Sequence, residues 1–131
     1  MKQKVYLAGG FRGNWQDLVK ENIDLVWLDP KVKERGVEEP EPMTLEEYGT
    51  WDLHHVKQAD IVFVYCEATN PACIGLSVEA GYAKGLGKTV ILVLEKNNIA
   101  IKDRYLDFLR TVSDIVFDDL DSGIKFLSKF Q

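Results

Sequence analysis

The segment Gly75-Leu76-Ser77-Val78-Glu79-Ala80-Gly81-Tyr82-Ala83-Lys84-Gly85-Leu86-Gly87-Lys88 lies between two runs of apolar residues. The first run, Ile-Val-Phe-Val-Tyr, covers residues 61–65, and the second, Thr-Val-Ile-Leu-Val-Leu, covers residues 89–94. Such runs are typical of strands that are buried on both faces of a sheet. A helix between them forms a β-α-β unit, in which the strands are parallel and the crossover is right-handed. Helical periodicity places a stripe of mostly small residues toward the sheet: Leu76, Ala80, Ala83 and Gly87.

Glu79 lies at the edge of this stripe, about 40° from Ala83 around the helix axis. Its carboxylate therefore does not point straight into solvent. It also lies at the carboxyl ends of the strands, where open α/β sheets bind their ligands. The helix dipole favours the ionised form of a carboxylate near a helix N-terminus. Two interpretations stay open: Glu79 acts as a nucleophile or base, or it only complements the dipole.

The same alternation of strand and helix extends over the whole chain. Further strands are expected at residues 4–8, 24–28 and 114–117, and further helices after Asn14 and at residues 44–58, 99–111 and 119–130. Five such alternations predict an α/β fold of one domain, residues 1–131. Its doubly wound, flavodoxin-like or Rossmann-like parallel sheet has the strand order 2-1-3-4-5, with helices on both faces. The ligand is then expected where the strand order reverses, between the first and third strands.

Composition restricts the class of protein. The chain has 131 residues, of which 46% are hydrophobic and 28% charged, as in soluble globular proteins. A net charge of −5 argues against binding to polymeric nucleic acid, but not against a single nucleoside or nucleotide. No apolar run approaches the roughly 20 residues that span a bilayer. The N-terminus leads directly into a strand without a signal peptide, so we expect a cytoplasmic protein that binds no membrane.

Cys66 and Cys73 lie in or near the end of one predicted strand. They form no Cys-x-x-Cys motif and have no histidine near them in sequence. We therefore expect no metal site, and no feature of the sequence calls for a cofactor. A disulfide between them is disfavoured in a reducing compartment.

A glycine-rich loop follows the first strand: Gly9-Gly10-Phe11-Arg12-Gly13. Glycines at this point let the backbone approach a ligand closely. The spacing matches neither Gly-x-Gly-x-x-Gly nor a P-loop, so the segment is either a binding loop or a plain turn. Residues 29–43, which contain three prolines, are long for a connection and indicate a lid or mobile segment.

The helix at residues 44–58 begins with a capping box formed by Thr44 and Glu47. Asp52 lies close to its buried side, which is unusual for a charged residue unless it is paired or functional. The predicted topology brings Asp52 and Glu79 into one pocket, with Tyr6 near its floor. Two carboxylates around a sugar suggest glycosyl chemistry with one of them as nucleophile, although a plain binding pocket stays open.

Several segments, in matching order, resemble the nucleoside 2-deoxyribosyltransferase family. They are Tyr6-Leu7-Ala8-Gly9, Asp52-Leu53 followed by Ala59-Asp60, the segment from Gly75 to Ala83, and Gly87-Lys88-Thr89-Val90. The resemblance implies that Glu79 is the nucleophile that attacks C1′ of deoxyribose. It implies that Asp52 handles the base or its leaving proton, and that Tyr6 positions the nucleophile and the sugar. Asn98 matches a polar residue that a neighbouring subunit lends to the pocket.

The 2′-deoxynucleoside 5′-monophosphate N-glycosidases are a close branch, and the Gly9–Gly13 loop with Arg12 is more similar to theirs. Gly10 and Cys73 replace the phosphate-binding hydroxyls of that branch, and Glu67 stands near the position of an acidic residue that many transferases carry after the central strand. The residues expected to bind substrate are Gly9, Gly10, Phe11, Arg12, Glu67, Cys73, Gly75 and Asn98.

The resemblance implies an enzyme that transfers deoxyribose from one base to another. The alternatives are an N-glycoside hydrolase acting on a nucleoside 5′-monophosphate or a modified nucleoside, and a nucleotide-binding module without catalysis. The expected partner is a small nucleoside or nucleotide. We also expect a homodimer or higher homo-oligomer, because Val78, Gly81 and Gly85 give the central helix a small outer face.

Overall fold

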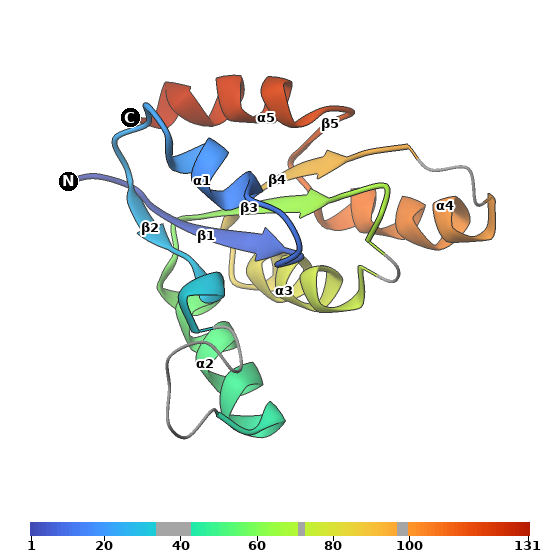
Figure 1. Ribbon diagram of the computed structural model, residues 1–131, viewed down its shortest axis with the longest axis horizontal. Helices are drawn as coiled ribbons and strands as arrows, with labels where there is room; N and C mark the ends of the chain where they lie inside the picture. Colours follow the sequence, from blue (N-terminus) through green and yellow to red (C-terminus); the bar gives the residue numbers. More distant parts are fainter. Residues whose placement is uncertain (34–42, 71–72, 97–99) are drawn as a thin grey trace.

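A five-stranded, entirely parallel sheet forms the centre of the protein (Figure 1). The computed structural model describes residues 1–33, 43–70, 73–96 and 100–131. The strands are β1 (Lys4–Gly9), β2 (Val26–Leu28), β3 (Ile61–Cys66), β4 (Thr89–Leu94) and β5 (Ile115–Phe117). Their order is β2-β1-β3-β4-β5, and each neighbouring pair is parallel. The predicted class and strand order are therefore confirmed.

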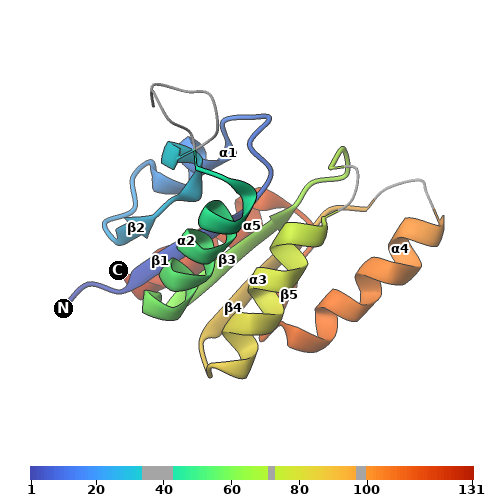
Figure 2. The same ribbon diagram turned by 90° about the horizontal axis from the view of Figure 1, so that it is seen from below.

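Helices cover both faces of the sheet. Helices α1 (Trp15–Lys20) and α5 (Leu120–Leu127) lie on one face, and α2 (Leu45–Gln58), α3 (Ile74–Gly85) and α4 (Ala100–Leu106) lie on the other (Figures 1 and 2). Three 3₁₀ segments, η1 (Pro30–Lys33), η2 (Asp107–Val112) and η3 (Ser128–Phe130), complete the described secondary structure. In the described ranges, no helix combines the length and apolar character needed to cross a membrane.

Strand β3 is the most buried element, since all six of its residues are buried. Its side chains alternate between two core clusters, as the period of two of a strand requires. Ile61, Phe63 and Tyr65 join the cluster beneath α1 and α5, whereas Val62, Val64 and Cys66 join the one beneath α2, α3 and α4. Tyr6 of β1 belongs to this second cluster, so its side chain points toward α2 and α3.

Helix α3 packs on the sheet through the predicted stripe, because Leu76, Ala80 and Ala83 are all buried. Gly87 departs from the prediction: it follows the helix and has a φ of +75°, so it makes the turn into β4. Glycine suits this position because a residue with a Cβ is disfavoured at positive φ.

The segment predicted as one helix over residues 99–111 is divided. Helix α4 ends at Leu106 and continues as the 3₁₀ segment η2. Leu106 and Leu109 are both buried, and their spacing of three residues matches the three residues per turn of a 3₁₀ helix. Of the long connection predicted at residues 29–43, residues 34–42 lie outside the described residues.

Candidate active site

Tyr6 and Glu79 meet at the carboxyl end of the sheet. Tyr6 is fully buried, and its hydroxyl donates a hydrogen bond to Oε2 of Glu79. Glu79 lies in the second turn of α3, on the side that turns toward β1, and its side chain is partly buried. Because β1 pairs directly with β3, two residues that are 73 positions apart in sequence can form this contact.

Asp52, on α2, lies at the same site as Glu79. The predicted capping box is present: Thr44 Oγ1 accepts from the Glu47 N–H at 3.2 Å, and Glu47 Oε1 accepts from the Thr44 N–H at 2.9 Å. This start fixes the phase of the helix and turns Asp52, two turns later, toward α3. Its Oδ1 atom is buried and has no hydrogen-bond partner among the described residues.

These side chains open into a cavity of about 350 Å³. It is lined by Gly9, Gly10, Phe11, Tyr48, Asp52, Asn70, Cys73, Ile74, Gly75, Leu76 and Glu79. A smaller pocket of about 180 Å³ adjoins it and shares Gly10, Phe11 and Asn70 with it. Arg12, Glu67 and Thr69 complete the smaller pocket. The two together form a hollow at the predicted switch point between β1 and β3.

Burial changes the protonation of Glu79. It raises the pKa of this carboxyl to about 8, an increase that the hydrogen bond from Tyr6 opposes and the nearby Asp52 reinforces. The expectation that the helix dipole keeps Glu79 ionised is therefore wrong. Glu79 is the sixth residue of α3, and the dipole acts mainly within the first turn, so desolvation outweighs it.

Asp52 is less buried, and its pKa rises to about 6, because desolvation outweighs the favourable charge of His55. Between these two values the pair of carboxyls carries one proton. Burial and the neighbouring Glu79 both raise the pKa of the Tyr6 hydroxyl, which therefore stays protonated and remains a donor. Two carboxyls with raised and different pKa values beside one cavity suit acid-base chemistry.

The structure brings most of the predicted site residues together. Gly9, Gly10, Phe11, Cys73 and Gly75 line the cavity with Asp52 and Glu79, and Tyr6 lies behind Glu79. Arg12 and Glu67 line the adjoining pocket instead. Asn98 lies outside the described residues.

Four lining residues were not predicted: Tyr48, Asn70, Ile74 and Leu76. Tyr48 precedes Asp52 by one helical turn, and this spacing could have identified it. Its hydroxyl donates to the Pro30 carbonyl oxygen at 3.0 Å.

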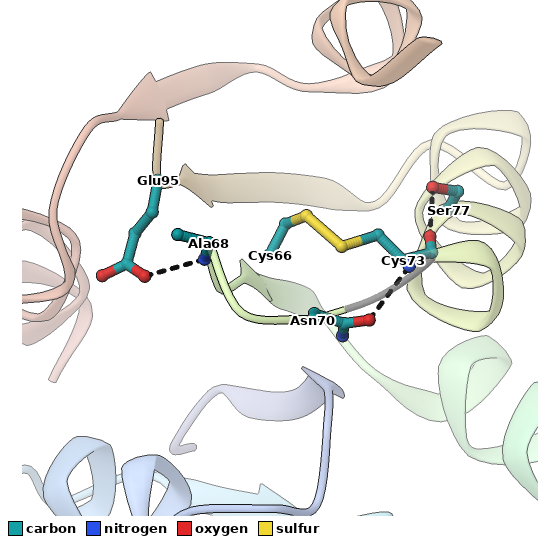
Figure 3. Close-up of a disulfide and its surroundings, with 6 residues drawn as sticks. All are labelled: Cys66, Ala68, Asn70, Cys73, Ser77 and Glu95. Atoms are coloured by element: carbon teal, nitrogen blue, oxygen red, sulfur yellow. Dashed lines mark hydrogen bonds between the residues drawn. A yellow bond between two sulfur atoms is a disulfide. The ribbon is translucent and has the colours of Figure 1, made fainter. Parts of the chain in front are cut away.

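Asn70 accepts from the Cys73 N–H at 3.0 Å and so shapes the loop before α3 (Figure 3). The Asn-Pro dipeptide at residues 70–71 is a turn signal in the sequence, but it does not show that Asn70 lies at the cavity.

The loop after β3 is fixed by Glu95, just after β4. Glu95 accepts hydrogen bonds from the Tyr65 hydroxyl at 2.8 Å and from the Ala68 N–H at 3.1 Å. Burial and the charge of Glu95 raise the pKa of Glu67, whereas Arg12 lowers it. The adjoining pocket thus presents an arginine and a carboxyl group side by side.

No group of three or more His, Cys, Asp or Glu side chains able to hold a metal occurs in the described ranges.

Cys66 and Cys73 form a disulfide, contrary to the prediction (Figure 3). Cys66 ends β3 and Cys73 directly precedes α3, so the start of α3 lies against the end of β3, and the two Cα atoms are 6.1 Å apart. This separation lies within the usual range for a disulfide. The prediction considered only the compartment, whereas the fold itself places the two sulfur atoms together. The bridge joins the cavity wall to the central strand.

Reduction of this disulfide is expected to lower the free energy of unfolding by about 2 kcal/mol, because it frees a short loop in the unfolded chain. Urea titrations with and without a phosphine reductant measure the change. The double variant Cys66→Ala/Cys73→Ala is the control and should give the same midpoint in both buffers. Equal midpoints for the wild type would contradict the pairing.

Stability should also report the raised pKa of Glu79. The folded state holds this proton up to pH about 8, whereas an ordinary Glu releases it near 4.5. The wild type should therefore lose stability relative to Glu79→Gln as the pH rises through this window, by about 1.4 kcal/mol per unit of pKa difference. Below and above the window the difference should be constant.

Urea titrations over this pH range test the expectation. Replacement of Glu46, which is exposed in the first turn of α2, by Gln controls for the change of charge alone. Stability curves of the wild type and Glu79→Gln that run parallel over the whole range would contradict the raised pKa.

The chain matches known proteins over much of its length. Residues 2–97 match the family model described as nucleoside 2-deoxyribosyltransferase like. No curated protein matches the sequence. Among solved structures, a 2-deoxyribosyltransferase from Bacillus psychrosaccharolyticus has a TM-score of 0.64 at 25% identity, over 91% of this chain and 88% of that one.

Two further structures share the fold at lower identity. A conserved protein from Enterococcus faecalis V583 has a TM-score of 0.75 at 14% identity, over 98% of this chain and 99% of the other. The CMP N-glycosidase of Clostridium botulinum has a TM-score of 0.60 at 18% identity, over 98% and 100%. The family model covers well over half of the sequence, and so the chain belongs to the nucleoside 2-deoxyribosyltransferase-like family.

Proposed function

We propose that the protein is a nucleoside 2-deoxyribosyltransferase that works through a covalent deoxyribosyl–Glu79 intermediate. The observation that carries the proposal is the hydrogen bond from Tyr6 to Glu79 beside a cavity that also holds Asp52. The family and the 2-deoxyribosyltransferase of similar fold support this reaction type.

In the first step, the Glu79 carboxylate attacks C1′ of a 2′-deoxynucleoside, and the bond from C1′ to the base nitrogen breaks. The electron pair of that bond stays on the base, which takes a proton from the Asp52 carboxyl. This step requires the one proton of the pair to be on Asp52 and Glu79 to be ionised, and the hydrogen bond from Tyr6, which lowers the pKa of Glu79, favours that distribution. Tyr6 keeps Glu79 oriented and stabilises its charged form.

In the second step, a nitrogen of another base attacks C1′ of the sugar ester. The bond to Glu79 breaks, Glu79 leaves as a carboxylate, and Asp52 accepts the proton of the incoming base. Both carboxyls then return to their starting protonation, so the cycle consumes no cofactor. The cavity of about 350 Å³ lies in the range of small-molecule sites.

The second candidate is hydrolysis, in which water replaces the incoming base. The Gly9–Gly13 loop with Arg12 and the shared fold with a CMP N-glycosidase favour it. A 5′-monophosphate in the pocket that holds Arg12 would also face the Glu67 carboxyl, which repels a phosphate when ionised. This arrangement favours a nucleoside over a monophosphate. A binding module without catalysis is the third candidate, against which the carboxyl pair argues.

One assay separates these functions. The protein is incubated with a 2′-deoxynucleoside and a second free base, and the products are analysed. A new nucleoside means transfer, free deoxyribose means hydrolysis, and saturable binding without turnover means a module. Repeating the assay with a 5′-monophosphate tests the alternative substrate.

Glu79→Gln should lower turnover at least about a thousandfold, because an amide cannot attack C1′. The variant should keep the fold, since the amide oxygen can still accept from Tyr6. A 2′-fluoro-arabinosyl nucleoside should leave its sugar on Glu79 of the wild type, as measured by mass spectrometry of peptides. Near-normal activity of Glu79→Gln would rule out the covalent mechanism.

Asp52→Asn should lower the rate by roughly a hundredfold or more, because the leaving base loses its proton donor. A nucleoside analogue whose base leaves readily without protonation should restore much of the rate. If Asp52 only supported α2, the variant would lose thermal stability, keep its rate per folded molecule and show no such rescue.

The protein is also proposed to be a homo-oligomer whose interface includes the outer face of α3. Ile74 and Val78 are 69% and 57% exposed there, which leaves an apolar surface beside the cavity. Apart from its chain neighbours and the backbone of α3 itself, a Cβ added at Gly81 would meet no atom of the described residues within 4 Å, so this glycine does not serve to accommodate another described helix of the chain. Helix α5 lies on the opposite face of the sheet (Figure 1).

Light scattering should show a dimer or larger assembly at micromolar concentration. Gly81→Leu should lower assembly and activity together, because its side chain would fill the face that another subunit approaches. The thermal midpoint of the isolated subunit should change little, since the position is open. A fully active monomeric wild type would disprove a shared site.

A further inference from the structure

The carbonyl oxygen of Gly10 accepts two hydrogen bonds from buried side chains. Trp15 Nε1 donates to it at 2.8 Å and Gln16 Nε2 at 2.9 Å. Trp15 is 3% exposed and Gln16 is 1% exposed, so both donor side chains are buried. A carbonyl oxygen has two lone pairs, and both are occupied on the side away from solvent.

This arrangement fixes the direction of the next peptide N–H. All peptide bonds in the described residues are trans, so the N–H of Phe11 points opposite to the Gly10 carbonyl. The Phe11 N–H makes no hydrogen bond within the described part of the chain. Gly10 and Phe11 line both the cavity and the adjoining pocket. The other end of the loop is also anchored by its carbonyl, because Lys31 Nζ donates to Gly13 O at 2.6 Å.

The position of Gln16 has no explanation in stability alone. Its Oε1 atom is buried and has no partner among the described residues. A buried acceptor without a partner is unfavourable, and an apolar residue of the same size would avoid that cost. The amide group nevertheless occupies this position, where its only hydrogen bond within the described residues holds the Gly10 carbonyl.

We propose that Gln16 is a positioning residue, which together with Trp15 turns the Phe11 N–H toward the cavity to donate to an oxygen atom of the bound substrate. The inference rests on the proposed function, since it assigns a contact within the same site. Gln16 touches no substrate itself and acts through the Gly10 peptide. Gly9 permits the arrangement, because a Cβ there would lie 2.7 Å from the Trp15 ring and 2.8 Å from the Tyr65 carbonyl oxygen.

The test is a double-mutant cycle with Trp15→Phe and Gln16→Met, using the four 2′-deoxynucleosides as substrates. Phe keeps the ring that packs on Phe63 and Tyr65 but lacks the donor. Met has nearly the length of Gln without its amide. Each single variant leaves one donor on the Gly10 carbonyl and should raise KM only a few-fold. The double variant should raise KM by about tenfold or more, beyond the product of the single effects, with kcat little changed.

Stability and NMR distinguish positioning from support of the fold. Gln16→Met should keep the urea midpoint of the wild type, because it removes an unpaired acceptor along with one hydrogen bond. Gln16→Leu is the second variant if Gln16→Met does not fold, and exposed Asp17→Asn is the control on the same helix. The amide signal of Phe11 should shift when a 2′-deoxynucleoside binds the wild type, and this shift should be lost in the double variant.

The outcomes separate the two proposals. An active wild type whose double variant keeps the wild-type KM, or whose Phe11 amide does not respond to substrate, overturns the role of Gln16 and leaves the proposed function intact. A loss of stability without a change of KM overturns it as well. A wild type that neither binds nor converts any 2′-deoxynucleoside overturns the proposed function, and the role of Gln16 with it.

Discussion

The hydrogen bond between Tyr6 and Glu79 is the contact on which the arrangement of the site depends. It requires β1 to lie beside β3, and it requires the second turn of α3 to lie over β1. Burial of a carboxyl group is costly unless the group is hydrogen-bonded or protonated. Here both occur, since Tyr6 donates to Glu79 and burial raises its pKa to about 8. The site therefore holds a proton because the sheet brings the buried Tyr6 and the partly buried Glu79 together.

Much of the fold could be predicted from the sequence, because its strongest patterns are local. The β-α-β unit follows from two apolar runs, which form β3 and β4, and from the stripe of small residues on α3. The remaining strands and helices follow from the alternation of elements. The boundary errors fall where local patterns are ambiguous, as in the segment divided between α4 and η2, where Leu106 and Leu109 fit either helical period.

The candidate site was predicted less completely, because its chemistry depends on burial and on contacts between distant segments. Asp52 and Glu79 carried visible signals, since each is a charged residue beside a buried stripe. The raised pKa of Glu79 could not be predicted, because desolvation depends on what packs around the carboxyl group. The disulfide depends in the same way on where the start of α3 lies relative to the end of β3. Asn70 lines the cavity through a loop conformation that the turn signal of its Asn-Pro dipeptide does not specify.

Buried polar atoms without hydrogen-bond partners, which are unfavourable for stability, lie where the proposed chemistry occurs. Within the described residues, two buried side-chain atoms lack hydrogen-bond partners, Gln16 Oε1 and Asp52 Oδ1. Asp52 lines the cavity, and Gln16 holds the peptide that forms its wall. The rest of the described core satisfies its buried polar side chains, so a general defect of packing does not explain the pair. Proteins retain unfavourable local features mainly at functional sites, where the arrangement of groups matters more than stability. The positions of these two atoms thus identify the same site as the Tyr6–Glu79 contact, from an independent property of the structure.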